Sequence, residues 1–159
     1  MRIRKLSIAG LLIFLLVSVH GQQEQLSVLL PASEAKFVAA SYPKSGPNRI
    51  TGTWAPTKTD IDGLEANLHQ ITDLSRKGKY SWMLIEHPDK YFRQYVGVVQ
   101  SGQKRIYVNA FCGFNNGTLA PKDWRNRLIH ISDGGNCVWR SLYDNTSKTF
   151  LELSINGLA

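Results

Sequence analysis

The strongest constraint on the fold is the pattern of the second half of the chain, where short segments rich in Val, Ile, Tyr, Phe and Trp alternate with turn residues. Such segments favour β-strands, because branched and aromatic side chains pack well on a pleated sheet. In the last segment, Leu151, Leu153 and Ile155 alternate with polar residues, which predicts a sheet with one buried face. The predicted strands cover residues 91–100, 104–112, 128–132, 136–143 and 150–155.

Turn residues between these segments predict that neighbouring strands pair in antiparallel fashion. A Ser-Gly pair at 101–102 separates the first two segments at hairpin length. An Asp-Gly-Gly sequence at 133–135 lies between the third and fourth, where glycine can adopt positive φ. Residues 144–148 form a longer hairpin loop, and only the connection over residues 113–127 is long.

One amphipathic helix is predicted over residues 60–76, ahead of the strands. Thr57 or Thr59 can cap its N-terminus, and acidic residues follow in the first turns, where the helix dipole favours negative charge. Gly78 follows the last turn and is a natural stop. Five apolar residues recur at helical spacing and form one face, which needs a surface to cover. They are Ile61, Leu64, Leu68, Ile71 and Leu74.

A helix followed by antiparallel strands predicts an α+β domain over residues 57–159. The amphipathic helix is expected to pack on one face of an antiparallel sheet of four to five strands, which on topology alone is a cystatin-like layout. The preceding residues 22–56 form a poorly defined N-terminal arm. Within it, residues 42–48 are dense in turn formers, and residues 50–54 form a short strand or an extended arm.

The first 21 residues predict a secretory signal peptide. Arg2, Arg4 and Lys5 provide the positive start, and an apolar run of about 14 residues follows them. This run is shorter than the roughly 20 residues that span a bilayer. It ends in small residues that suit cleavage near Gly21. We therefore expect a soluble protein exported to the periplasm or the extracellular space.

The formal net charge of +7 overstates how basic the expected mature chain is. Three of the 19 Lys and Arg residues, and none of the 12 acids, lie in the first 21 residues, so the remainder carries +4. Its basic residues are spread out, whereas a nucleic-acid-binding surface requires a dense basic stripe, so no nucleic-acid partner is expected. No membrane anchor is expected either, since there is no second long apolar run and no cysteine for lipid attachment after the signal.

Two cysteines, Cys112 and Cys137, make a disulfide the natural expectation in an exported protein. In a simple meander of the five predicted strands, however, they would lie at opposite ends of the sheet. A disulfide requires Cα atoms within about 7 Å of each other. Either the pair is not bonded, therefore, or the connection over residues 113–127 crosses the sheet and breaks the meander. Export favours the bond.

No motif for catalysis or cofactor binding is found in the sequence. The chain has no GxxxxGK phosphate loop, no dinucleotide fingerprint and no GxSxG nucleophile elbow. His69, His87 and His130 lack the spacing of a zinc site, and no loop gathers the oxygen ligands that calcium requires. We therefore expect no metal, no cofactor and no catalytic residue.

Two hypotheses for function follow. The first is a non-enzymatic module that binds a protein, peptide or envelope component through the sheet face or through the long loop over 113–127, where Trp124 lies beside Arg125 and Arg127. Trp and Arg are residue types that anchor partner interfaces, and loops on a rigid sheet often carry binding. The alternative is a small extracytoplasmic hydrolase or ligand-binding enzyme that uses polar side chains on the sheet face. Its candidate residues are Arg93, Tyr107, Asn109 and His130.

Several short motifs occur in order along the chain. They are Trp54-x-Pro56, Tyr91-Phe92-Arg93-Gln94-Tyr95-x-Gly97, Asn109-Ala110-Phe111-Cys112, Asp133-Gly134-Gly135-x-Cys137 and Asn156-Gly157-x-Ala159. As a set they resemble a group of small exported bacterial proteins of unknown function, over nearly the whole expected mature chain. The resemblance implies no activity. It does imply that the cysteine after the Asp-Gly-Gly turn pairs with the one that ends Asn-Ala-Phe-Cys.

A resemblance to the cystatins extends to a single motif. Cystatins insert a Gln-x-Val-x-Gly loop into papain-like proteases, and this chain has Gln94-Tyr95-Val96-Gly97, which is one residue short. The motif also falls inside a predicted strand instead of at a hairpin tip. Both departures argue against protease inhibition.

Overall fold

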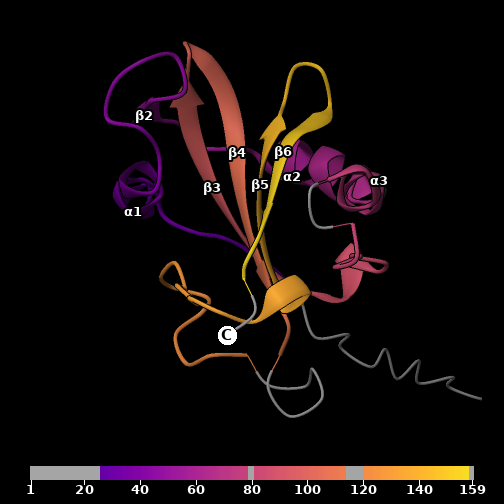
Figure 1. Ribbon diagram of the computed structural model, residues 1–159. Coiled ribbons are helices and arrows are strands. Elements are labelled where there is room, and N and C mark those ends of the chain that lie inside the picture. Colours follow the sequence, from indigo (N-terminus) through magenta and orange to yellow (C-terminus); the bar gives the residue numbers. More distant parts are fainter. Residues whose placement is uncertain (1–25, 79–80, 114–119, 158–159) are drawn as a thin grey trace, which may run out of the picture.

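The computed structural model describes residues 26–78, 81–113 and 120–157, so the expected signal peptide lies outside the described residues. The fold is α+β, as predicted. A six-stranded, mostly antiparallel open sheet has the order β1-β3-β4-β5-β6, and β2 also pairs with β3. Helices lie on both faces of this sheet, with α1 on one side and α2 and α3 on the other (Figure 1). The structure does not confirm the cystatin-like layout with its single helix.

Four long strands form an antiparallel meander, and each matches a predicted segment to within about two residues. They are β3 (Phe92–Gln100), β4 (Gln103–Phe111), β5 (Val138–Asp144) and β6 (Thr149–Ile155). The β3–β4 turn is the predicted Ser-Gly pair. Ser101 and Gly102 both have positive φ, at 54° and 73°, as the tightest hairpin turns require.

Two short strands from the segment before the helices extend the sheet along one edge of β3. β1 (Ser27–Leu29) runs parallel to β3, with Ser27 opposite Arg93. β2 (Ile50–Thr53) runs antiparallel to it, with Thr53 opposite Val98. Between them, the 3-10 turn Ala32–Glu34 leads into α1 (Ala35–Ala40). The segment before the helices therefore contributes two strands, β1 and β2, to the same sheet as the rest of the fold.

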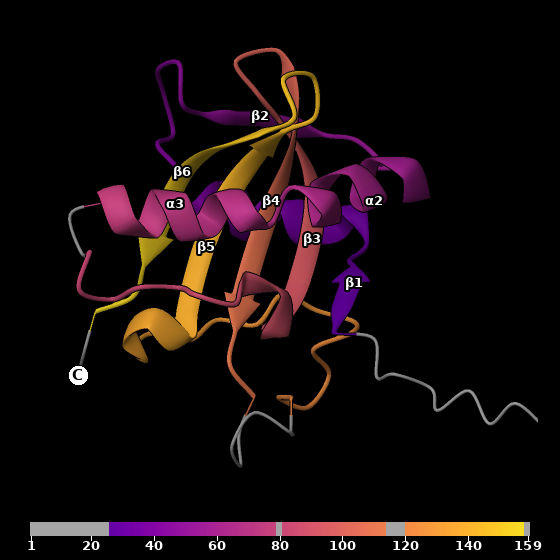
Figure 2. The same ribbon diagram turned by 90° about the vertical axis from the view of Figure 1, so that its right-hand side faces the viewer.

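The predicted helix over 60–76 is divided into α2 (Lys58–Ala66) and α3 (His69–Lys77). The break lies at Asn67, whose side-chain amide donates to the Gly63 carbonyl while its backbone N–H bonds to Leu64. The predicted N-cap and stop are confirmed, because Thr57 forms a capping box with Asp60 and α3 ends at Gly78. Figure 2 shows the two helices in line across the sheet.

The predicted strand over 128–132 is wrong, because these residues form no strand. Their backbone groups bond to side chains of the sheet instead: Asn109 donates to the Ile129 carbonyl, and the Ile129 N–H donates to Gln94, both at 2.9 Å. Arg140 likewise donates to the Ile131 carbonyl at 3.1 Å. This segment therefore lies on the sheet instead of in it.

Without that strand, β5 follows β4 directly in the meander, and the two cysteines meet. Cys112 and Cys137 form a disulfide with Cα atoms 4.9 Å apart, beside a backbone hydrogen bond from Cys112 N–H to the Cys137 carbonyl. The disulfide that export favours is therefore present, and the apparent conflict with the meander arose because residues 128–132 were counted as a strand between the two cysteines.

Apolar residues bury both faces of the sheet. On one face, Leu64, Leu68 and Ile71 of the α2–α3 pair pack on Trp139 and Tyr143. On the opposite face, the main apolar cluster is Leu30, Ala35, Val38, Val96, Val98, Tyr107 and Leu142, with Leu128 packed against it. Within the described ranges, no helix has the length and apolar character needed to cross a bilayer.

Candidate functional site

The sheet face that carries α1 has two adjoining hollows, which we call the α1 groove. Ser41, Tyr107 and Arg140 line both hollows and form their junction. The larger hollow has a volume of about 580 Å³ and the smaller about 290 Å³. The larger one lies between Phe37 on α1 and the segment 127–130. Ligand sites in proteins commonly have volumes of about 300–1,000 Å³.

Strand register brings Tyr107 and Arg140 together. Asn109 of β4 pairs with Arg140 of β5, and Tyr107 pairs with Leu142, so all four side chains lie on the same face. Tyr107 and Arg140 are diagonal neighbours across the two strands, a spacing that long side chains can bridge. The antiparallel pairing of β4 with β5 thus builds the floor of the groove.

Tyr107 is the most unusual residue of the groove. Its side chain is only 3% exposed, yet its hydroxyl has no hydrogen-bond partner among the residues that the structure describes. Burial raises the pKa of this phenol to about 12, although the nearby Arg140 charge opposes the shift. The hydroxyl is not one of the fully buried polar atoms that lack a partner in the described part of the chain, so it opens on the groove. At neutral pH it is a protonated donor facing the groove.

Arg140 is held in place by two contacts at its guanidinium group. One Nη donates to Asn156 Oδ1 at 3.0 Å, and the other donates to the Ile131 carbonyl at 3.1 Å. A guanidinium has five N–H groups, so these two bonds orient its plane and leave donors for a third partner. Its half-buried position beside Tyr107 makes it a pre-oriented cation.

Two acidic side chains border the groove, and each is engaged. Glu34, 8% exposed, accepts a hydrogen bond from the Leu128 N–H at 2.8 Å. Glu152 accepts one from the Tyr42 hydroxyl at 2.7 Å, next to the smaller hollow. Burial and this hydrogen bond both raise the pKa of Tyr42. The larger hollow keeps a positive balance, because Arg127 and Arg140 line it against Glu34 alone, with His130 at its rim.

Raising the pH above about 10 is expected to destabilise the folded protein. Tyr107 ionises near pH 12 in the folded chain and near pH 10 when unfolded, so its contribution is complete below pH 10 and is lost as the pH rises through 12. Burial also raises the pKa of Tyr95. Each such tyrosine costs up to about 1.4 kcal/mol per pH unit in this range.

Urea unfolding between about pH 8 and about pH 11 measures this loss. Tyr107→Phe should flatten the pH dependence, since it keeps the ring and removes the ionising group. An unfolding free energy that stays constant to pH 11 would contradict the assignment.

The residues proposed from sequence as a polar sheet-face site do not form one group. Tyr107 and His130 both line the α1 groove. Asn109 lies beneath the segment over the sheet, where its amide donates to Gln94 and Ile129 at 2.9 Å, so it supports the groove wall. Arg93 is on the opposite face, with α2.

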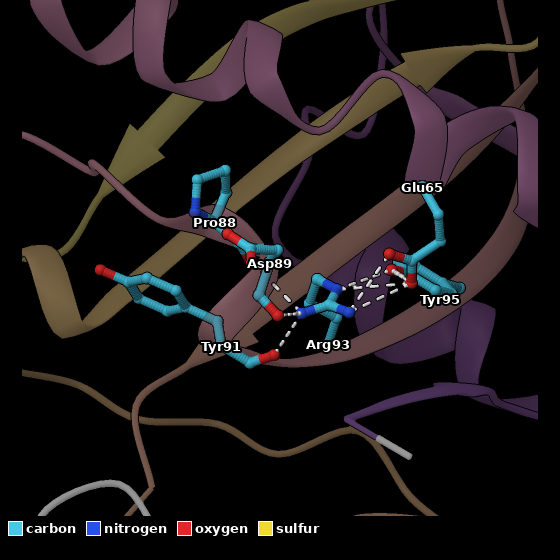
Figure 3. A network of polar contacts seen from close by, with 6 residues as sticks. All are labelled: Glu65, Pro88, Asp89, Tyr91, Arg93 and Tyr95. Carbon is cyan, nitrogen blue, oxygen red and sulfur yellow. Dashed lines mark hydrogen bonds and ion pairs between the residues drawn. The ribbon is translucent and has the colours of Figure 1, made fainter. Parts of the chain in front are cut away.

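Figure 3 shows why Arg93 belongs to a structural network. Its guanidinium pairs with Glu65 of α2 at 3.2 Å and donates to the Tyr95 hydroxyl at 3.0 Å. It also donates to the backbone carbonyls of Pro88, Asp89 and Tyr91. With these acceptors the cation is fully engaged, and it joins α2 to β3 and to the turn before it.

The residues of the long loop that were proposed from sequence to anchor a partner do not form one group either. Trp124 is 6% exposed and packs edge-on against Phe92 and Phe111. Arg125 stacks over the Trp124 ring, 4.4 Å from its centroid. Arg127 is exposed and lines the larger hollow. The aromatic ring thus anchors the loop to the sheet, and Arg127 is the member of this group that reaches the groove.

Sequence reasoning did not find Arg140 or Phe37. Alternation within β5 places Arg140 on the other face of the sheet from Trp139 and Ser141. Its position beside Tyr107, however, depends on the register between two strands that lie 25 or more residues apart in the sequence. Phe37 is 51% exposed on a six-residue helix too short to show periodicity. No local signal marks either residue.

Comparison of the chain with protein-family models, curated proteins and solved structures finds no match. Among the described residues, no three His, Cys, Asp or Glu side chains come together as a metal site would require. The function must therefore be argued from the groove itself.

Proposed function

We propose that this protein is an exported, non-enzymatic binding module that holds a peptide segment of a partner protein in the α1 groove. The observation that supports this most strongly is the Tyr107 hydroxyl, which lines the groove beside the oriented guanidinium of Arg140 and bonds to none of the described residues. Both groups are donors, and a ligand that supplies acceptors can bond to both of them.

The chemistry of the groove favours binding over hydrolysis. A general acid or base works best with a pKa near the operating pH, and burial moves the pKa of Tyr107 to about 12. The cysteines are bonded to each other, so neither supplies a thiolate. His130 is exposed at the rim. What the groove offers is a neutral donor, a fixed cation and an apolar wall.

The walls of the groove suit a short stretch of polypeptide. Phe37, Leu128 and Ile129 offer apolar surface in the larger hollow, while Ser41, Ser154 and Glu152 offer polar groups in the smaller one. Peptides bind through this combination, because side chains enter apolar pockets and main-chain groups need hydrogen bonds. The positive balance of the larger hollow favours an anionic group on the ligand.

Selection of a random peptide library on the purified protein tests this proposal. We expect enriched peptides whose affinity falls about tenfold or more with Phe37→Ser, because Phe37 is half exposed and forms a groove wall. Leu151→Ser is the matched control, since Leu151 is 44% exposed on β6 and lies outside the groove lining. Failure to enrich any peptide, or equal losses with both variants, would contradict groove binding.

A further inference from the structure

We propose that the junction of Tyr107 and Arg140 is a carboxylate site, and that the α1 groove takes the free C-terminus of a peptide whose last side chain is apolar. This inference rests on the proposed function and narrows it. It assigns the larger hollow to the last side chain, the junction to the terminal carboxylate and the smaller hollow to the preceding main chain.

The donors at the junction match a carboxylate. A carboxylate only accepts hydrogen bonds, and Tyr107 and Arg140 both donate there. The guanidinium plane is fixed by Asn156 and by the Ile131 carbonyl, so it is oriented before a ligand arrives. Arginine forms its strongest contacts with planar oxyanions in this way. A neutral amide would add N–H donors where the site already has donors.

The two hollows differ in a way that gives the ligand a direction. Beyond the junction on one side lie Phe37, Leu128 and Ile129, which suit an apolar side chain. On the other side lie Glu152 and Ser154, whose oxygens can accept hydrogen bonds from a peptide main chain. A fatty acid carries no N–H for Glu152. A peptide C-terminus uses both hollows and the junction between them.

Arg127 and His130 strengthen the same preference. Both line the larger hollow near its rim, and Arg127 is only loosely paired with Asp123, at 3.9 Å. The opposing carboxylate of Glu34 is buried and accepts a hydrogen bond from Leu128 N–H. The Glu152 carboxylate acts on Tyr107 from the smaller hollow, where it accepts the Tyr42 hydroxyl, so a negative ligand group is favoured on the side of the junction that faces the larger hollow.

The test compares three defined probes by amide chemical-shift titration of the purified protein. They are N-acetyl-Ala-Ala-Leu with a free carboxylate, the same peptide as its C-terminal amide, and octanoate. We expect the free acid to shift resonances of the groove residues, and the amide and octanoate each to bind at least about tenfold more weakly. Tyr107→Phe should lower the affinity for the acid about threefold to tenfold and leave binding of the amide unchanged.

Controls separate recognition from folding. Tyr107→Phe should keep the wild-type urea midpoint near neutral pH, because its hydroxyl bonds to none of the described residues. Tyr143→Phe is the matched control, since its hydroxyl lies on the opposite face with Gly63 and Asn67. It should leave the preference for the acid unchanged. Arg140→Gln should abolish that preference.

Each remaining outcome has one meaning. Equal affinity for acid and amide, with library binding still sensitive to Phe37→Ser, would overturn the carboxylate site and spare the groove. Octanoate binding as tightly as the acid would overturn the peptide assignment. If no probe binds and no library peptide is enriched, both this inference and the proposed function fail.

Discussion

Replacing Gly97 with alanine is expected to destabilise the protein by about 3 kcal/mol or more. The chain that leaves β2 passes directly over Gly97, and an added Cβ would lie 2.2 Å from the Trp54 carbonyl oxygen and 2.6 Å from the Pro56 ring. Backbone on one side and a proline ring on the other cannot rotate away. The connection to α2 would have to lift off the sheet. The free energy of unfolding in urea measures the loss.

Gly52→Ala is the matched control for this prediction. Gly52 is also a strand glycine on the same sheet edge, but its added Cβ would meet Val99 at 3.7 Å, an ordinary contact. We expect a change within about 0.5–1 kcal/mol for this variant. A Gly97→Ala protein as stable as Gly52→Ala would show that the crossing over Gly97 is looser than the structure describes.

Glu65→Gln is expected to cost about 2 kcal/mol, the second large effect. The substitution keeps the shape of the side chain but removes the charge that Arg93 pairs with at 3.2 Å. The Arg93 side chain is 7% exposed, so its cation would remain buried with neutral acceptors only. Glu65 also accepts the Tyr95 hydroxyl at 2.5 Å, and an amide oxygen accepts that bond less strongly. Because Glu65 is 28% exposed, the cost lies below that of a fully buried pair.

A double-mutant cycle with Arg93→Met isolates the pairwise part of this cost. The sum of the stability losses of the two single variants should exceed the stability loss of the double variant by about 1–2 kcal/mol. The reason is that the double variant leaves no unpaired charge. Asp62→Asn on the same helix is the control, since its pair with Lys58 is exposed and contributes less than about 1 kcal/mol. Additive losses at Glu65 and Arg93 would contradict the coupling.

Local pattern predicted the repeating elements of the fold. The four meander strands, the turn at Ser101 and Gly102, and the cap at Thr57 all depend on neighbours a few residues away, which the chain itself specifies. The Gln94–Gly97 motif also lies inside β3, as predicted, and not at a hairpin tip. The prediction of a single helix failed at Asn67, which bonds to Gly63 and Leu64 where α2 ends, although the apolar face continues across the break.

The segment over 128–132 shows why the remaining elements were not predictable. Leu128, Ile129 and Ile131 have the composition of a strand, and they are partly buried as strand residues would be. Whether they pair with a strand depends on whether polar side chains elsewhere can satisfy their backbone. Gln94 and Asn109 do so from the middle of the sheet. Because these side chains are distant in the sequence, the spacing of residues within 128–132 does not indicate that they replace a neighbouring strand as hydrogen-bond partners.

The residues of the candidate site were also only partly predictable from the sequence. Composition alone identified Tyr107 and His130 as polar groups able to reach a sheet face, but it grouped them with Arg93, which lies on the other face in the network with Glu65. Alternation assigns a residue to a face only after the register between strands is known. That register also decides that Arg140 lies beside Tyr107.

The sequence by itself determined that this chain builds an α+β fold from a β-meander and an amphipathic helical region, because periodicity and turn chemistry act over a few residues. The tertiary structure decided which edge β1 and β2 occupy, how Cys112 meets Cys137, and which side chains form the α1 groove. These features depend on contacts between residues far apart in the sequence. Such contacts form when the free energy gained by burying whole apolar faces exceeds the entropic cost of closing the intervening chain into a loop. The proposed site lies among these long-range contacts, which is why its central pair emerged only from the folded protein.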